Sequence, residues 1–186
     1  MAEDFLSYEE EIRITRGQVA KTQTKPLLIV GWCAFAIGML IVALWYGTGD
    51  PHYQYLWLVF PVVAILLTAV MCRRQKIEKT SLYRSLTLIS RLEAAIIAIL
   101  AICALLLDMD TYWMILCTMS LMCGLTGYLL KLPDIWRAAI GGLAMMAAVI
   151  VTKDSPAEAA TFTFGVVATM VVPGYILLRE SKKITA

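Results

Sequence analysis

Long apolar runs separated by short polar stretches form the main pattern of this chain. A helix needs about 20 apolar residues to cross a hydrocarbon core roughly 30 Å thick. Six runs approach that length, each bounded by charged or turn-forming residues. They cover residues 27–46, 55–72, 92–107, 112–130, 135–152 and 157–178. We therefore predict an all-α membrane protein in which residues 26–178 form a bundle of six transmembrane helices.

The third run is the least regular of the six. Only Ala94 to Leu107 is uninterrupted by charge, although apolar residues at helical spacing extend back through Leu92 and Leu88. We expect a short span that is adequate when tilted. The first run follows Pro26, and proline suits the first turn of a helix.

The first 25 residues have a different pattern, in which acids come early, bases come late and apolar residues share one helical face. Ser7, with Glu10 three residues later, matches a capping box at a helix start. We predict an amphipathic cytoplasmic helix within residues 1–25. It would lie on the membrane surface, which we favour, or against the basic loop between the second and third spans.

The basic residues are placed unevenly along the chain. All sixteen Lys and Arg residues except Lys153 lie before span one, between spans two and three, beside the loop between four and five, or after span six. Basic residues are retained on the cytoplasmic side of short loops. This distribution predicts that both termini, including the tail 179–186, are cytoplasmic. The composition also favours a membrane protein, because 60% of residues are hydrophobic and 16% charged, against about 45–50% and 25% in soluble domains.

Residues suited to chemistry are sparse. No run has an ionisable residue near its midpoint, which disfavours proton-coupled transport. The single histidine, His52, stands beside Asp50 in a predicted outer loop; we interpret the pair as a solvated turn rather than a proton-transfer couple. The five cysteines form no CxxC pair. We expect no catalytic site, cofactor or metal.

Two groups of charged residues are candidates for an interaction or switch. The first combines the acidic Glu9, Glu10 and Glu11 with the basic Arg73 and Arg74 of the loop between spans two and three. The second is Glu93, which borders the third span, with Arg137 near the same predicted boundary. We favour side chains that reach water at the interface; the alternative is a buried ion pair that biases a conformational change.

Prolines and glycines interrupt several runs. Pro61 in the second span and Pro173-Gly174 in the sixth predict helix kinks. We assign these kinks to packing, because their neighbours are apolar and lack the polar partners of a transporter site. The glycines permit close approach of helices within one bundle, and a homo-oligomer seam is the alternative.

Three segments resemble a family of small uncharacterised multi-span membrane proteins from Bacteroidetes. They are the start Ser7-Tyr8-Glu9-Glu10-Glu11-Ile12, the second-span stretch Tyr55-Leu56-Trp57-Leu58-Val59-Phe60-Pro61-Val62, and the ending Val171-Val172-Pro173-Gly174-Tyr175-Ile176-Leu177. The resemblance implies a location in the bacterial inner membrane and implies no catalytic activity.

Our leading hypothesis is a non-enzymatic inner-membrane protein that binds a partner or senses membrane state through its cytoplasmic face. Its partners would be the lipid bilayer, a cytoplasmic protein and further copies of itself, with no nucleic acid. The first alternative is a carrier or channel for an uncharged or apolar solute. The second is a membrane enzyme acting on lipid.

Overall fold

A computed structural model describes residues 2–60, 63–64, 80–107 and 110–185, and every regular element in those ranges is a helix. This confirms the predicted all-α class. The elements are α1 (Ala2–Thr48), the 3-10 helix η1 (Pro51–Leu58), α3 (Ser81–Leu107), α4 (Tyr112–Leu129), α5 (Pro133–Val151), α6 (Pro156–Val166), the π-helical turn η2 (Val167–Val171) and α7 (Val172–Thr185).

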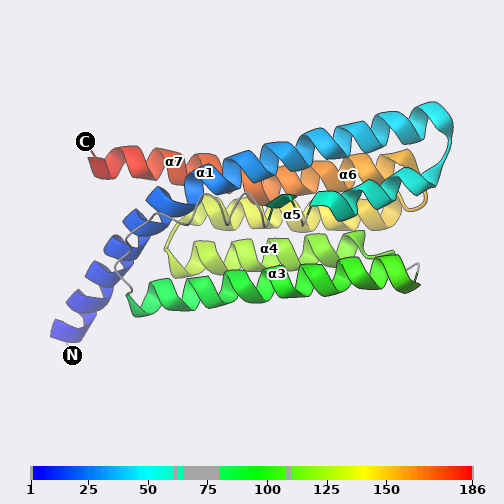
Figure 1. The fold of residues 1–186 in the computed structure, drawn as a ribbon. Coiled ribbons are helices and arrows are strands. Elements are labelled where there is room, and N and C mark those ends of the chain that lie inside the picture. The colour runs from blue at the N-terminus through cyan, green and yellow to red at the C-terminus, as the bar shows by residue number, and fades with distance from the viewer. Residues whose placement is uncertain (1, 61–62, 65–79, 108–109, 186) are drawn as a thin grey trace.

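The long helices lie side by side, and both chain termini lie at one end of the bundle (Figure 1). We call this the terminal end; it also contains the start of α3 and the turn between α4 and α5. The opposite, hairpin end contains the connections that follow α1, α3 and α5. α3 lies at the edge of the bundle, against α4 and the first part of α1.

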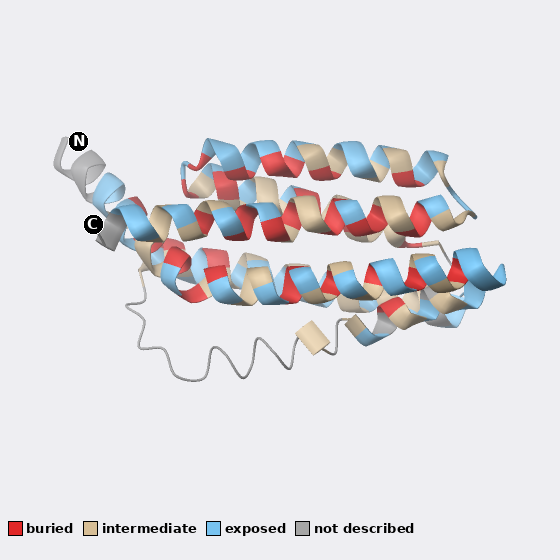
Figure 2. Ribbon diagram, turned by 90° about the horizontal axis from the view of Figure 1, so that it is seen from above, coloured by how far each residue is buried: buried red, intermediate tan, exposed pale blue. Residues whose placement is uncertain are grey.

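Buried side chains form two apolar clusters along the bundle. The central cluster is built from Ala34, Ile41, Trp45, Trp57, Leu116, Met119, Val149, Ala159, Phe162 and Val166. The terminal cluster is built from Ile12, Val19, Ala20, Leu82, Leu86, Leu130, Leu132, Ile135 and Leu177. Buried and exposed positions alternate along each helix (Figure 2), so each helix has one packed side and one outer side.

The outer sides of the helices are strongly apolar. Leu106 is 73% exposed and Val151 is 85% exposed, and many other large apolar side chains are similarly uncovered. Among the described residues, five helices are long and apolar enough to cross a membrane, within Tyr8–Thr48, Ser81–Ala104, Tyr112–Leu129, Pro133–Val151 and Pro156–Lys183. Both observations fit a multi-pass membrane protein, because a soluble protein seldom exposes so large an apolar surface. Most of the predicted second span, 55–72, lies outside the described residues, so six spans remain a prediction.

The N-terminal segment and the first span are one helix, α1, rather than two. Ser7 lies inside α1 rather than at a helix start, and Pro26 lies in its middle rather than in a first turn. Proline lacks an N–H, so the helix loses a backbone bond at this point. Just before it, Thr22 Oγ1 donates a hydrogen bond to the Gln18 carbonyl at 2.9 Å. Such bonding bends helices, and the first part of α1 runs at an angle to the rest (Figure 1).

α3 is longer than the predicted third span. It begins at Ser81, so residues 81–91 belong to the same helix as 92–107. The two arginines in this added part, Arg84 and Arg91, are exposed. Their long side chains can reach water from an otherwise apolar helix. Glu93, expected at the border of a span, is therefore the thirteenth residue of a 27-residue helix.

The predicted kink sites differ in what the structure shows of them. A π-helical turn, Val167–Val171, ends two residues before Pro173, and such turns accommodate a missing helical hydrogen bond. Gly174 lies against α1, where a Cβ would come within 2.9 Å of the Leu28 side chain. Pro61 lies outside the described residues.

Adjacent glycines in α5 have different surroundings, which makes them a test of helix packing. A Cβ on Gly142 would overlap the Ser120 hydroxyl on α4 and the Thr169 methyl on η2, whereas a Cβ on Gly141 would meet nothing within 4 Å. Gly142 thus permits the contact between α4, α5 and η2.

We predict opposite effects of alanine at these two positions. Gly142→Ala should destabilise the protein by about 1–3 kcal/mol through overpacking. Gly141→Ala should be neutral or stabilising by up to about 1 kcal/mol, because alanine is the better helix former. Thermal unfolding of both variants in one detergent measures the difference. Equal loss of stability in the two variants would contradict the packing described.

Candidate functional site

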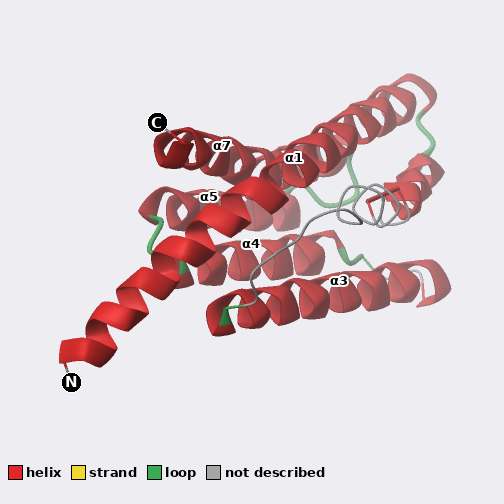
Figure 3. Cartoon of the chain, turned by 60° about the vertical axis from the view of Figure 1, so that its left-hand side comes forward, coloured by secondary structure: helices red, strands yellow, loops and turns green. Residues whose placement is uncertain are grey.

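The N-terminal part of α1 crosses the ends of α3 and α4 at the terminal end of the bundle (Figure 3). We call residues 8–25 the N-terminal segment. Its buried Ile12, Val19 and Ala20 pack in the terminal cluster with residues of α3, α4, α5 and α7. The segment is therefore part of the folded bundle. This arrangement differs from the surface-lying helix that we favoured from the sequence.

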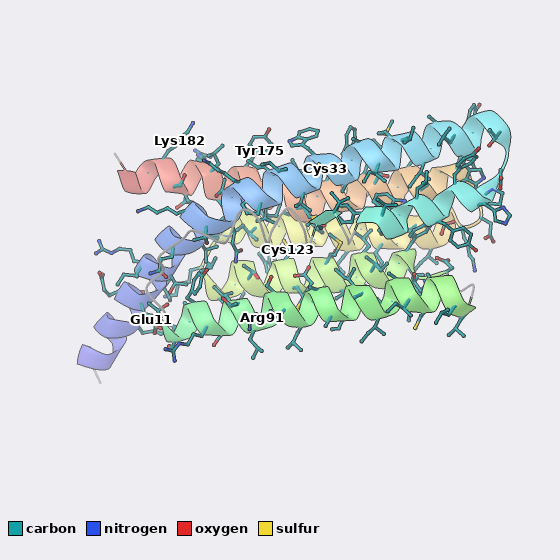
Figure 4. The ribbon with its side chains drawn as sticks, in the orientation of Figure 1. Glu11, Cys33, Arg91, Cys123, Tyr175 and Lys182 are labelled. Carbon is teal, nitrogen blue, oxygen red and sulfur yellow. The ribbon has the colours of Figure 1, made fainter. Side chains whose placement is uncertain are left out.

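Glu11 binds the first turn of α3. Its Oε1 accepts hydrogen bonds from the Ser81 hydroxyl at 2.6 Å and from the Leu82 N–H at 2.9 Å, and Figure 4 shows it beside the start of α3. The first N–H groups of a helix have no partner within the helix, and the helix dipole favours a negative charge there. The Glu11 carboxylate meets both requirements.

Two threonines complete this contact. Thr15 Oγ1 and Thr80 Oγ1 are 2.8 Å apart, and Thr80 Oγ1 also accepts a bond from the Tyr83 N–H at 3.2 Å. Thr80 is the residue before α3 and acts as its N-terminal cap. Thr15 is completely buried. One side of the N-terminal segment thus supplies two polar groups to a single helix start.

The pKa of Glu11 is lowered from its ordinary value of 4.5, first by the hydrogen bond from Ser81 and then by that from the Leu82 N–H. Glu11 lies in the charged part of α1, well before the apolar run at 27–46. A lowered pKa means that the docked segment favours the carboxylate form.

Arg16 binds the last turn of α4. Its Nη2 donates to the Leu130 carbonyl at 2.7 Å and to the Lys131 carbonyl at 3.3 Å, and its Nε donates to the Leu130 carbonyl at 3.2 Å. The last carbonyls of a helix lack partners within the helix and carry the negative end of its dipole. The guanidinium supplies both the donors and the positive charge.

The turn after α4 is further fixed by Lys131. This residue has a φ of 51°, a left-handed conformation that ends a helix. Its Nζ lies 3.0 Å from Glu9 Oε1 and 5.8 Å from the centre of the Tyr8 ring. The first turns of the segment therefore contact the same turn that Arg16 caps.

The three predicted acids have three separate roles. Glu9 pairs with Lys131, Glu11 binds the start of α3, and Glu10 pairs with Arg13 one turn along at 2.7 Å on the exposed side. They do not act as one acidic patch. The predicted basic partners Arg73 and Arg74 lie outside the described residues.

Glu93 and Arg137 have different surroundings. Arg137 Nη1 bonds Asp134 Oδ1 at 2.9 Å, and the Arg137 side chain is 74% exposed. Glu93 is partly buried on α3, and no ion pair to it is found in the part of the chain that the structure describes. The sequence left open whether these two residues pair, and the structure gives Arg137 a nearer partner.

Two further features concern a possible proton-transfer pair and possible metal ligands. At the hairpin end, Asp50 Oδ1 accepts a bond from the His52 N–H at 2.9 Å and lies 2.6 Å from His52 Nδ1. The His52 backbone N–H first, and its ring second, hold the pKa of Asp50 below its usual range. Within the described ranges, no three His, Cys, Asp or Glu side chains gather as metal ligands.

A shallow groove of about 300 Å³ lies between α4 and α5. Its floor is formed by Ser120, Gly124 and Ala139, and its walls by apolar and aromatic side chains of both helices. Tyr128 and Trp136 in these walls are 74% and 51% exposed. The groove therefore opens on the outer surface of the bundle rather than into its interior.

Arg16, Thr15 and Thr80 were missed from the sequence. Thr80-Ser81 before an apolar helical pattern is a recognisable helix start. That Glu11 and Arg16 would reach two different helix ends could not be read from the sequence, because it depends on the angle at which α1 crosses the bundle.

We predict that Glu11→Gln loosens the N-terminal segment, while Glu10→Gln does not. Both changes remove one charge, but only Glu11 binds α3. Loss of a helix cap weakens a structure by about 1 kcal/mol, which corresponds to a roughly fivefold faster local opening. Hydrogen exchange of peptides covering 8–20 and 80–86 measures this. The assignment fails if both variants, or neither, exchange faster.

No protein-family model matches this chain, and no curated protein or solved structure is significantly similar to it. The resemblance to the Bacteroidetes membrane family therefore remains a prediction that depends on the three segments named above.

Proposed function

We propose that this is a non-enzymatic inner-membrane protein that binds a partner protein or senses membrane state through its terminal end, which faces the cytoplasm. The N-terminal segment is the movable part of this device. Docked, it holds α3 and α4 together; undocked, it presents its own polar side and uncovers both helix ends.

The proposal depends on the contacts that one helix makes with the ends of two others. Glu11 and Arg16 are five residues apart in one helix, and they bond the start of α3 and the end of α4. Movement of the N-terminal segment would therefore change both helix ends together. The bonds are polar and accessible at the bundle end, so a competing charged surface could replace them.

The charge distribution supports the cytoplasmic orientation. Of the twelve basic residues in the described chain, Arg91 lies further along α3 and ten belong to segments at the terminal end or its flanks: Arg13, Arg16, Lys21, Lys25, Arg84, Lys131, Arg137, Arg179, Lys182 and Lys183. Lys153 lies at the hairpin end, 3.8 Å from Asp110. Cytoplasmic loops of membrane proteins have this excess of Lys and Arg.

No specific observation favours either of the two alternative functions. A solute carrier would be favoured by a cavity inside the bundle; the groove found among the described residues opens sideways between α4 and α5. A lipid-modifying enzyme would need Glu93, Asp134 and Arg137 to converge. Asp134 and Arg137 pair on an exposed surface, and Glu93 stands apart on α3.

The test compares an undocked protein with a matched control in native membranes. Glu11→Ala with Arg16→Ala removes both helix-end contacts, and Glu10→Ala with Arg13→Ala removes an exposed pair of the same charges. Quantitative co-purification should show at least one protein whose recovery changes severalfold in the first variant and not in the second.

Deletion of residues 1–21 gives the limiting case. It should change the recovery of the same co-purifying protein in the same direction as the undocked variant does, or abolish that recovery. If recovery of every protein is unchanged by both the deletion and the undocked variant, the proposed function is wrong.

A further inference from the structure

Glu93 lies well inside a helix that crosses the membrane. It is the thirteenth residue of α3, which runs from Ser81 to Leu107. Counting about 20 residues back from Leu107, the number needed to cross the hydrocarbon, reaches Leu88; at 1.5 Å per residue this places Glu93 roughly 8 Å inside the boundary. A carboxyl group at this depth is costly and commonly functional.

The residue also lies on the packed side of α3. Several of the less exposed positions of this helix lie at helical spacing from one another, namely Leu82, Leu86, Ile89, Glu93, Ile97, Leu100 and Ala104. From residue 90 to residue 96, Glu93 is the single position that is not classed as exposed. Glu93 is therefore the residue through which the middle of α3 faces the bundle.

Glu93 separates the two apolar clusters of the core along α3. Leu82 and Leu86 belong to the terminal cluster, and Ile97 packs against the central cluster. An apolar residue between them would make one continuous seam. The carboxyl group of Glu93 interrupts this seam.

Few charged groups surround this carboxyl group. From α4, Cys123 is close enough for a charge on Glu93 to act on its thiol, and that thiol donates to the Ile135 carbonyl of α5 at 3.7 Å. α1 meets α3 at its first turns, where Glu11 and Arg16 are held by helix ends. Arg91 lies on the side of α3 away from α4 (Figure 4). In the described chain, no cation offsets a charge on Glu93.

We propose that Glu93 is a proton-binding site within the membrane, and that its proton occupancy controls the packing of α3 against α4. With the proton bound, the neutral carboxyl packs between the two clusters. When the proton leaves for water, the carboxylate must be hydrated, and water reaches it as α3 separates from α4 near Cys123.

This inference deepens the proposed function by naming a stimulus for the N-terminal segment. Leu82 and Leu86 of α3 form part of the terminal cluster that also holds Ile12 and Val19. Separation of α3 from α4 would pull apart the two helix ends that Glu11 and Arg16 bridge. A proton on Glu93 would thus favour the docked segment, and a rise in pH would favour release.

Cys123 is a natural reporter of the proposed separation. The sample is the full chain in vesicles, with the other four cysteines replaced by alanine. Labelling of Cys123 by a water-soluble maleimide is measured between pH 6 and 9. Rates are divided by those of the detergent-unfolded protein at the same pH, which removes the pH dependence of the thiol. The expected result is at least a fivefold rise in relative rate, abolished by Glu93→Gln.

The matched control keeps Cys117, also on α4, as the single cysteine, and its relative rate should not change with pH. A flat profile at Cys123, or an equal rise with and without Glu93→Gln, would overturn the inference. Labelling of Cys123 reports the contact between α3 and α4, whereas co-purification reports binding of a partner protein, so failure of this inference is distinguishable from failure of the proposed function.

A second measurement uses the unchanged protein. Hydrophobic carbodiimides react with protonated carboxyl groups in apolar surroundings, so dicyclohexylcarbodiimide should modify Glu93 at pH 6, as mapped by mass spectrometry. The exposed Glu10 serves as the internal control and should remain unmodified. Absence of an adduct at Glu93 would also overturn the inference.

Discussion

The start of α3 and the end of α4 present unpaired backbone groups of opposite polarity at the same end of the bundle, and α1 supplies the complementary charge to both. Glu11 accepts from the first N–H groups of α3, and Arg16 donates to the last carbonyls of α4. The end groups of a helix have no partner within the helix and carry the partial charges of its dipole. The course of the first 25 residues follows from this constraint.

The rest of the bundle depends on close contacts that leave the helices little freedom. Gly38 lies against Thr163, Gly165 against Leu116, and Gly142 against Ser120 and Thr169. Helices in lipid associate through such small-residue contacts because apolar side chains gain little by leaving lipid for protein. α3 differs, since it lies at the edge and has a carboxyl group on its packed side. Movement is therefore expected at α3 and the N-terminal segment rather than among α4, α5 and α6.

The helical class, the membrane-spanning character and most helix ends could be predicted from the sequence, because apolar runs and turn residues act locally. Residues 133–151, for example, were expected within one residue or two from Lys131-Leu132-Pro133-Asp134 and Lys153-Asp154-Ser155-Pro156. Two boundaries were wrong. Pro26 was read as a helix start but lies inside α1, and the helix that contains the third predicted span begins at Ser81 rather than near Arg91.

The candidate site was only partly predictable. A contribution from Glu9, Glu10 and Glu11 was expected from their charge, yet their three different partners depend on the crossing of α1 over the bundle. Glu93 was noted as the acid nearest a span, and its position on the packed side became clear once α3 was seen to begin at Ser81. The central claim is that the N-terminal segment docks on α3 and α4 in the membrane.

A disulfide between cysteines placed at Thr15 and Thr80 tests that claim most directly, because the two hydroxyl oxygens are 2.8 Å apart. In an otherwise cysteine-free chain in native membranes, Thr15→Cys with Thr80→Cys should cross-link rapidly under mild oxidation. Thr15→Cys with Ser85→Cys, which places the second thiol on an exposed part of α3, should not. Equal rates in the two pairs, or no cross-link in either, would contradict the docked arrangement.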